Sequence, residues 1–174
     1  MQEERVRQFV LQALSELSGT KSEAAYLVDL RIKGPQRGRK IEIIADTDAG
    51  IRISQCAKVS RRIREMIEND SEALSYVGED FELMVSSPGL GEPLKFPRQY
   101  IRHSGKLLRV TYTDESGVQS ELFGRLVDLS LSDESRQWIM IMPEKKRSKG
   151  AKNDKNSVTL YLDQIVRSVP EAEL

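Results

Sequence analysis

The sequence has one cysteine, Cys56, and one histidine, His103, among its 174 residues. A single cysteine cannot form an internal disulfide, and together with one histidine it falls short of the usual ligand set of a zinc site. No stretch approaches the roughly 20 apolar residues of a membrane helix, and residues 1–5 lack the basic and then apolar character of a secretory signal. We therefore expect no metal, no other cofactor, no membrane segment and a cytoplasmic location.

An excess of charge of one sign is also absent, because 27 Lys and Arg balance 27 Asp and Glu. This balance argues against a protein that coats nucleic acid through its overall charge. Positive charge is concentrated locally instead. Residues 31–40 hold five basic side chains and no acid, and residues 144–155 hold six basic side chains against two acids. We expect any attraction of nucleic acid at these two clusters.

Hydrophobic periodicity in the first half predicts two helices and three strands. Apolar residues recur at spacings of three and four in the helical stretches, and they alternate with polar residues in the strands. The expected helices are residues 6–17, ending at Gly19, and 55–69, with Ser54 as N-cap; the expected strands are 26–33, 41–46 and 81–86. The order α-β-β-α-β predicts a two-layer domain with both helices on one face of the sheet. Residues 34–39, rich in glycine and proline, predict a turn, so the first basic cluster lies at a hairpin tip.

A dense group of chain breakers separates the two halves. Residues 87–97 contain three prolines and two glycines, which no helix or central strand tolerates. We therefore expect an N-terminal domain at 1–90, a linker at 91–98 and a C-terminal domain at 99–174. In the last domain a helical turn at 98–102 precedes short strands at 107–113, 119–129, 137–142, 157–161 and 165–169. This pattern predicts a small all-β barrel, and the fold class of the whole chain is α+β.

One motif at the end of the first domain is specific. Residues 81–90 read Phe-Glu-Leu-Met-Val-Ser-Ser-Pro-Gly-Leu, and Pro93-Leu94 and Phe96 follow. This string resembles the signature of the ribosome maturation factor RimP family, in which a strand runs into a Ser-Ser-Pro-Gly turn followed by Pro-Leu. Residues 56–63, Cys-Ala-Lys-Val-Ser-Arg-Arg-Ile, are similar to the second helix of that family, and the order of elements matches along nearly the whole chain.

The resemblance implies an N-terminal domain laid out like one class of KH RNA-binding domain and a C-terminal Sm-like or SH3-like barrel. It implies a ribosome assembly factor, not an enzyme, that is required for maturation of the small (30S) subunit. Such a factor binds rRNA and the ribosomal protein S-twelve transiently, near the future decoding region. We expect a monomer without a small-molecule substrate.

The sequence departs from the family pattern in two places. Gly91 and Glu92 stand where the family usually has an acid and an arginine, and Glu92 thereby reverses a charge that would favour rRNA phosphate. Gln55 stands where the family tends to have an acid before the cysteine. That change loses only the interaction of a negative charge with the helix dipole, about 0.3–1 kcal/mol.

The candidate ribosome-binding residues are basic side chains of the hairpin tip, the second helix and the loop 143–156, together with small residues of the turn after the third strand. They are Arg37, Arg39, Lys40, Arg61, Arg62, Ser86, Ser87, Gly89, Lys145, Lys146 and Arg147. The alternatives are a solvated helix face and serines that cap the backbone before a tight turn. Arg61 and Arg62 lie about 100° apart on a helix, so at most one faces a single partner. The basic loop has no aromatic residue on which bases could stack.

Two other functions compete with the assembly factor. An Sm-like RNA-binding regulator would act off the ribosome, generally as a ring. A hydrolase using Ser86 or Ser87 would need His103 as base, but no Gly-x-Ser-x-Gly elbow is present and we expect His103 at the surface. The strand aromatics are expected in the barrel core, although Trp138 also has the character of an interface anchor; these aromatics are Tyr112, Phe123, Trp138 and Tyr161.

Overall fold

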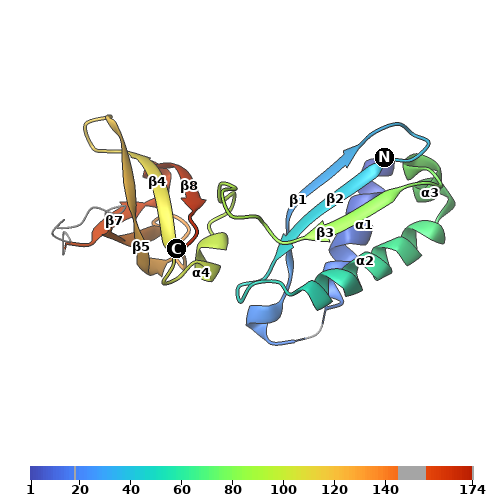
Figure 1. The fold of residues 1–174 in the computed structure, drawn as a ribbon, viewed down its shortest axis with the longest axis horizontal. Coiled ribbons are helices and arrows are strands. Elements are labelled where there is room, and N and C mark those ends of the chain that lie inside the picture. The colour runs from blue at the N-terminus through green and yellow to red at the C-terminus, as the bar shows by residue number, and fades with distance from the viewer. Residues whose placement is uncertain (18, 145–155, 174) are drawn as a thin grey trace. The chain divides into compact units, whose positions relative to one another are not determined.

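The computed structural model describes residues 1–17, 19–144 and 156–173, and the chain divides into two compact units, Met1–Pro88 and Gly89–Leu174. Unit 1 is a three-stranded sheet with helices, and unit 2 is a five-stranded antiparallel sheet with one short helix (Figure 1). The chain is therefore mixed α+β, as expected from the sequence.

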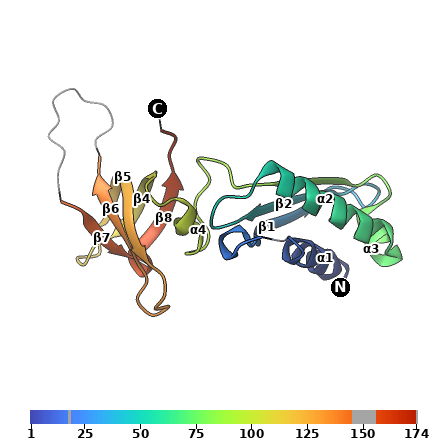
Figure 2. The same cartoon turned by 90° about the horizontal axis from the view of Figure 1, so that it is seen from below.

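Unit 1 keeps the expected element order and adds one helix. Its sheet has the order β1-β2-β3, with β1 antiparallel and β3 parallel to β2. The helices α1 and α2 pack against each other on one face of this sheet (Figure 2). The elements are α1 (Gln2–Ser15), a 3-10 turn (Lys21–Glu23), β1 (Tyr26–Lys33), β2 (Lys40–Asp46), α2 (Ile53–Glu68), α3 (Ser71–Val77) and β3 (Glu82–Ser86).

The core of unit 1 lies between the sheet and the helices. Ile41 and Ile43 of β2 are fully buried, and Val10 of α1 and Ile63 of α2 cover them from the helical layer. Lys40 and Glu42 alternate with these strand positions on the opposite face. The alternation in the sequence therefore predicted correctly which side of β2 is buried. In β1 the register shifts between Leu27 and Asp29, and Leu27, expected on the outer face, packs against the core.

Two helix boundaries in unit 1 correct the expectations. Helix α2 begins at Ile53 with Arg52 as N-cap, so Ser54 is not the cap. The reason is Gln55, whose side-chain oxygen accepts a hydrogen bond from the Arg52 backbone N–H at 2.8 Å. Helix α3 was missed because it has only seven residues; Asp70 caps it by accepting from the Ala73 N–H at 2.9 Å.

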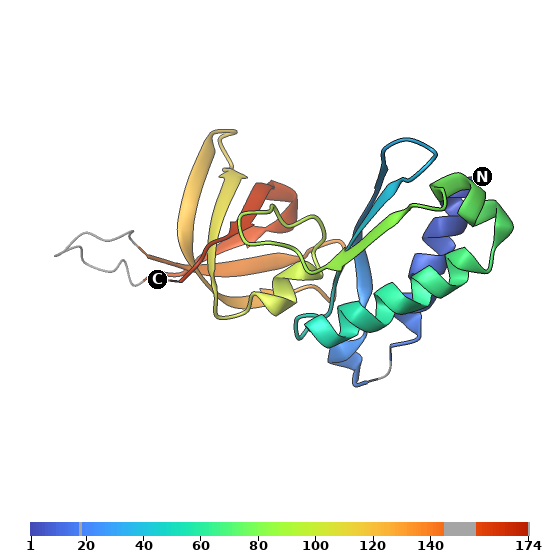
Figure 3. The ribbon, with the colours of Figure 1, turned by 45° about the vertical axis from the view of Figure 1, so that its right-hand side comes forward.

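Unit 2 is built on a sheet with the order β7-β6-β5-β4-β8. The β4–β5 hairpin is long (yellow and gold in Figure 3). Buried Leu108, Leu126 and Ile139 form part of the core, with Tyr100 packed among them. No backbone pairing joins β7 to β8 among the described residues. The elements are α4 (Gln99–Arg102), β4 (Leu107–Thr113), β5 (Gln119–Ser130), β6 (Trp138–Pro143), β7 (Val158–Tyr161), a 3-10 turn (Leu162–Gln164) and β8 (Ile165–Pro170).

The stretch expected as a linker, 91–98, is attached to unit 2. The Leu94 N–H donates to the Ser168 carbonyl at 2.8 Å, and the Gly91 N–H donates to the Pro170 carbonyl at 3.3 Å. This stretch thus lies along strand β8. His103, which ends α4, is only 9% exposed. The expectation that His103 lies at the surface is therefore wrong, because α4 packs against the core of unit 2 through Tyr100.

Candidate nucleic-acid interface

The hairpin tip between β1 and β2 is held by Arg39. Its Nε donates to the Tyr76 carbonyl at 2.8 Å, a terminal nitrogen donates to the Gly34 carbonyl at 3.3 Å, and the guanidinium lies 4.5 Å from the centre of the Tyr76 ring. These contacts link the tip to helix α3. Arg39, a candidate rRNA contact by sequence, is thus committed to its own chain.

Two glycines allow the tip to pack closely on the turn after α3. Gly78 has φ +86°, and a Cβ there would lie 2.2 Å from the Arg37 carbonyl oxygen. A Cβ at Gly38 would lie 2.9 Å from the Asp80 carbonyl oxygen. Both positions therefore favour glycine, because side chains would separate the two segments. The backbone of Arg37 is fixed by this packing, whereas its side chain is exposed.

Three lysines and arginines at this end of the sheet form what we call the cationic tip: Lys33, Arg37 and Lys40. All three are exposed. Lys33 stands directly opposite Lys40 in the strand register, an arrangement of like charges that costs stability unless an anion is nearby. Lys40 lies 3.6 Å from Glu42, whereas the side chains of Lys33 and Arg37 form no ion pair or hydrogen bond with another described residue. Lys33 was absent from the sequence-based candidates, although its place in the first basic cluster could have indicated it.

Of the two candidate arginines on α2, Arg61 is exposed and Arg62 forms ion pairs within the chain. Arg62 Nε lies 2.8 Å from Glu16, the C-cap residue of α1, and a terminal nitrogen lies 3.3 Å from Glu65. The hydrogen bond from Arg62 lowers the pKa of the Glu16 carboxyl. Arg61 is exposed and pairs with no other described residue, and Lys58, one turn earlier, is likewise exposed and unpaired within that part of the chain. Arg61 is therefore the candidate arginine of α2 whose side chain is unpaired among the described residues.

The turn after β3 carries the remaining small candidates. Ser86 ends β3, and Ser87 follows it; both are half-buried. Neither hydroxyl hydrogen-bonds to another described residue, so the alternative in which these serines cap the backbone is wrong. Gly89 and Glu92 are exposed, which leaves the reversed charge of Glu92 beside the turn. Lys145, Lys146 and Arg147 lie outside the described residues.

Unit 1 lacks the sequence motif with which KH domains hold nucleic acid. KH domains hold the nucleic-acid backbone with a Gly-x-x-Gly loop, and the 174-residue sequence contains no Gly-x-x-Gly. Asn69 and Asp70 connect α2 to α3, and Asp70 is paired with Arg5 at 2.7 Å. Any rRNA contact by unit 1 therefore depends on its exposed cations.

Among the described residues, no group of three or more His, Cys, Asp or Glu side chains is placed to hold a metal ion. None of the helices in residues 1–17, 19–144 and 156–173 has the length and apolar character needed to cross a membrane. Burial raises the pKa of the Cys56 thiol, which disfavours the reactive thiolate.

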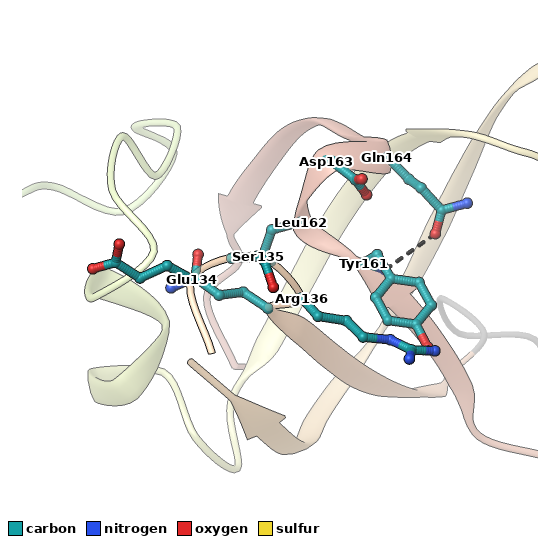
Figure 4. A pocket seen from close by; sticks show the side chains of 8 residues that line it. Glu134, Ser135, Arg136, Tyr161, Leu162, Asp163 and Gln164 are labelled. Atoms are coloured by element: carbon teal, nitrogen blue, oxygen red, sulfur yellow. Dashed lines mark hydrogen bonds between the residues drawn. The ribbon is translucent and has the colours of Figure 1, made fainter. Parts of the chain in front are cut away.

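Unit 2 has a surface hollow at the ends of β6 and β7. It is lined by residues 134–137 and 161–164 (Figure 4). The Arg136 guanidinium lies 5.4 Å from the centre of the Tyr161 ring and donates to the Tyr161 hydroxyl oxygen at 3.1 Å. Glu134 and Asp163 place carboxylates around the same hollow. Tyr161, Trp138 and Phe123 lie outside the apolar core, contrary to expectation, whereas Tyr112 packs against it.

Comparison with known proteins identifies the family. The RimP N-terminal domain model matches residues 19–91. Over 172 residues the chain is 56% identical to the ribosome maturation factor RimP of Pelodictyon phaeoclathratiforme, which covers 99% of both chains. It is 50% identical to that of Chlorobium limicola over 99% of this chain and 98% of the relative, and 32% identical to that of Cytophaga hutchinsonii over 76% and 72%. The chain belongs to the ribosome maturation factor RimP family.

Proposed function

We propose that the protein assists maturation of the small (30S) ribosomal subunit by binding rRNA through unit 1 and a ribosomal protein, S-twelve by family resemblance, through unit 2. The relatives that align over 99% of the chain carry the name ribosome maturation factor, a name that describes assembly and no chemical reaction. We further propose that it acts in the cytoplasm as a monomer, without a cofactor.

The observation that carries the rRNA part is the cationic tip. The tip backbone is fixed by Gly78 and Arg39, while Arg37 and Lys33 remain exposed and unpaired among the described residues. Cations on a rigid backbone lose little backbone freedom when they meet phosphate. The exposed Arg61 of α2 offers a further contact of the same kind.

Binding through a small number of phosphate contacts also suits a factor that must leave. Each neutralised phosphate contributes roughly 0.7–0.9 to the slope of log affinity against log salt. Two or three phosphate contacts give a weaker attraction than that of proteins that make six or more such contacts. The neutral net charge of the chain points the same way.

The mechanism that we propose is a shift of population. A factor that binds one arrangement of the immature subunit more tightly than its competitors favours that arrangement by the difference in binding free energy. Binding and release are sufficient for this effect, and no covalent step is needed.

Co-sedimentation tests the proposal. Purified protein is mixed with free small subunits, large subunits and mature ribosomes at low and raised salt. We expect selective binding to free small subunits that weakens with salt and with Arg37→Glu, while Glu79→Lys, a charge change at an exposed site of the same unit, does not weaken it. Binding to isolated RNA without binding to any ribosomal particle would instead support an RNA-binding regulator.

A further inference from the structure

The outer face of the unit 2 sheet carries an apolar row that the core does not use. Along β6, Ile139 and Ile141 are fully buried, while Trp138, Met140 and Met142 alternate with them on the opposite face. These three side chains are half-buried, and none belongs to the hydrophobic core of the unit. The strand is therefore apolar on both faces, although only one face packs inside the unit.

Strand register extends this row into a patch. Tyr161 of β7 pairs directly with Trp138, so the two aromatic side chains share a face. Arg136 lies over the Tyr161 ring beside the hollow (Figure 4). We call Trp138, Met140, Met142 and Tyr161 the outer β6 face. Aromatic residues, methionine and arginine are the side chains enriched at the centres of protein–protein interfaces, and methionine adapts its shape to a partner.

Among the described residues, the charges around the outer β6 face are mostly negative. Asp128 stands opposite Met140 in the register, Glu134 and Asp163 line the neighbouring hollow, and Asp133 interacts with Arg136. The one base at the hollow, Arg136, is already engaged with Tyr161. Arg125, which stands opposite Met142 in the register, is paired with Glu144 and Glu173. The described acids near this face thus outnumber its two bases, both of which are engaged, and they attract a cationic partner.

We propose that the outer β6 face binds an extended, lysine- and arginine-rich segment of a ribosomal protein. The acidic side chains complement such a segment, and the faces of Trp138 and Tyr161 accept its cations at close range. Strand β7 is an edge of the sheet, so a segment reaches Tyr161 without displacing another strand. This inference rests on the proposed function, since it names the surface through which unit 2 engages the ribosomal particle.

The test uses the full chain and purified small-subunit ribosomal proteins, each free of RNA and fluorescently labelled, with protein-free small-subunit rRNA as the competing ligand. Because Trp138 is the single tryptophan, its intrinsic emission reports whether unlabelled ligand covers this face. We expect at least one ribosomal protein to bind and to change that emission. In anisotropy titrations, Trp138→Ala and the pair Glu134→Lys with Asp163→Lys each weaken binding about tenfold or more, as hot-spot residues do.

Matched controls separate this face from the rest of unit 2. Val166→Ala removes an apolar side chain that is 58% exposed on β8, and Glu115→Lys reverses an exposed acid in the β4–β5 turn; both should bind as the unchanged chain does. Trp138→Phe should retain most of the affinity, because it keeps an aromatic face.

Three results would overturn the inference. These are the absence of binding to every small-subunit protein, binding that the variants leave unchanged, and a Trp138 emission change caused by rRNA alone. If the charge-reversed variant still sediments with free small subunits as tightly as the unchanged chain, the outer β6 face is not used there although the proposed function stands. If the unchanged chain fails to sediment with them, the proposed function itself fails.

Discussion

The Arg39 guanidinium lies against the ring of Tyr76 and donates a hydrogen bond to its carbonyl oxygen, across 37 residues of sequence. This contact ties the tip of the β1–β2 hairpin to the last turn of α3. Arg37, two residues earlier, has no such contact with a described residue and is exposed. Neighbouring arginines of one basic cluster therefore have different roles: Arg39 fixes the tip, and Arg37 is presented by it.

The first prediction separates these roles. Arg39→Ala should lower the free energy of unfolding of unit 1 by about 1–3 kcal/mol, because it removes a charge-assisted hydrogen bond and an aromatic contact. Arg37→Ala should leave stability within about 0.5 kcal/mol, as surface substitutions usually do. Hydrogen exchange of β2 amides measures both. Equal stability of the two variants would contradict the structural role of Arg39.

The second prediction concerns the fit between the tip and Gly78. Gly78→Ala should destabilise unit 1 by more than the roughly 1–3 kcal/mol of backbone strain, because the added Cβ would lie 2.2 Å from the Arg37 carbonyl oxygen. Gly34→Ala is the matched control: its φ is also positive, at +94°, but the nearest atom is 3.7 Å away. The loss in thermal stability, followed by helical circular dichroism, should be clearly larger for Gly78→Ala. Similar losses would show that close packing contributes nothing.

The contacts of Arg39 and Gly78 show which features of unit 1 could be predicted from the sequence and which could not. Alternation in β1 and β2 predicted the two strands and the buried face of β2, and glycine and proline between them predicted the tip. The sequence could not show which arginine is free, because that depends on Tyr76, a distant residue in a helix too short for its periodicity to be recognised. Local patterns report local structure, whereas the availability of a side chain is set by tertiary contacts.

The aromatic residues of unit 2 show the same limit. Trp138 and Tyr161 lie in correctly predicted strands, yet they face away from the core, because Ile139 and Leu160 occupy the buried positions next to them. A strand that is apolar on both faces shows no alternation of apolar and polar residues, so its buried face cannot be predicted from the sequence. Its outward side is known only once the neighbouring strands are placed.

The third prediction concerns acid stability. The hydrogen bond from Arg5 lowers the pKa of Asp70, so this carboxylate favours the folded state above its unfolded pKa, about 3.9. The contribution is lost as pH falls through the lower folded value. Between pH 5 and pH 2 the melting temperature by circular dichroism at 222 nm, which reports mainly the helices of unit 1, should fall less in Asp70→Asn than in the unchanged chain.

Asp70→Asn should also melt lower at pH 7, because asparagine keeps the helix cap but loses the ion pair. Glu79→Gln removes an exposed acid that pairs with no other described residue, and it should follow the pH profile of the unchanged chain. A profile of Asp70→Asn that falls as steeply as this control would rule out a role for the Arg5 pair in acid stability.

The fourth prediction uses the buried hydrogen bond of unit 2. The hydroxyls of Tyr100 and Ser168 lie 2.6 Å apart, with the residues 6% and 1% exposed. Burial raises the pKa of Tyr100, and the bond to Ser168 opposes that shift. Tyr100→Phe and Ser168→Ala should each lower the free energy of unfolding by about 1–3 kcal/mol, because each leaves one buried hydroxyl without its partner.

The double variant should lose less than the sum of the two single changes, because neither hydroxyl then remains to be desolvated. Fluorescence of Trp138 during urea unfolding measures all three variants, since this tryptophan lies in unit 2. The interaction free energy from the double-mutant cycle should be about 0.5–3 kcal/mol, the range found for residues in contact. Strict additivity would mean that the two hydroxyls do not stabilise each other, and that packing of the Tyr100 ring alone holds α4 on the sheet.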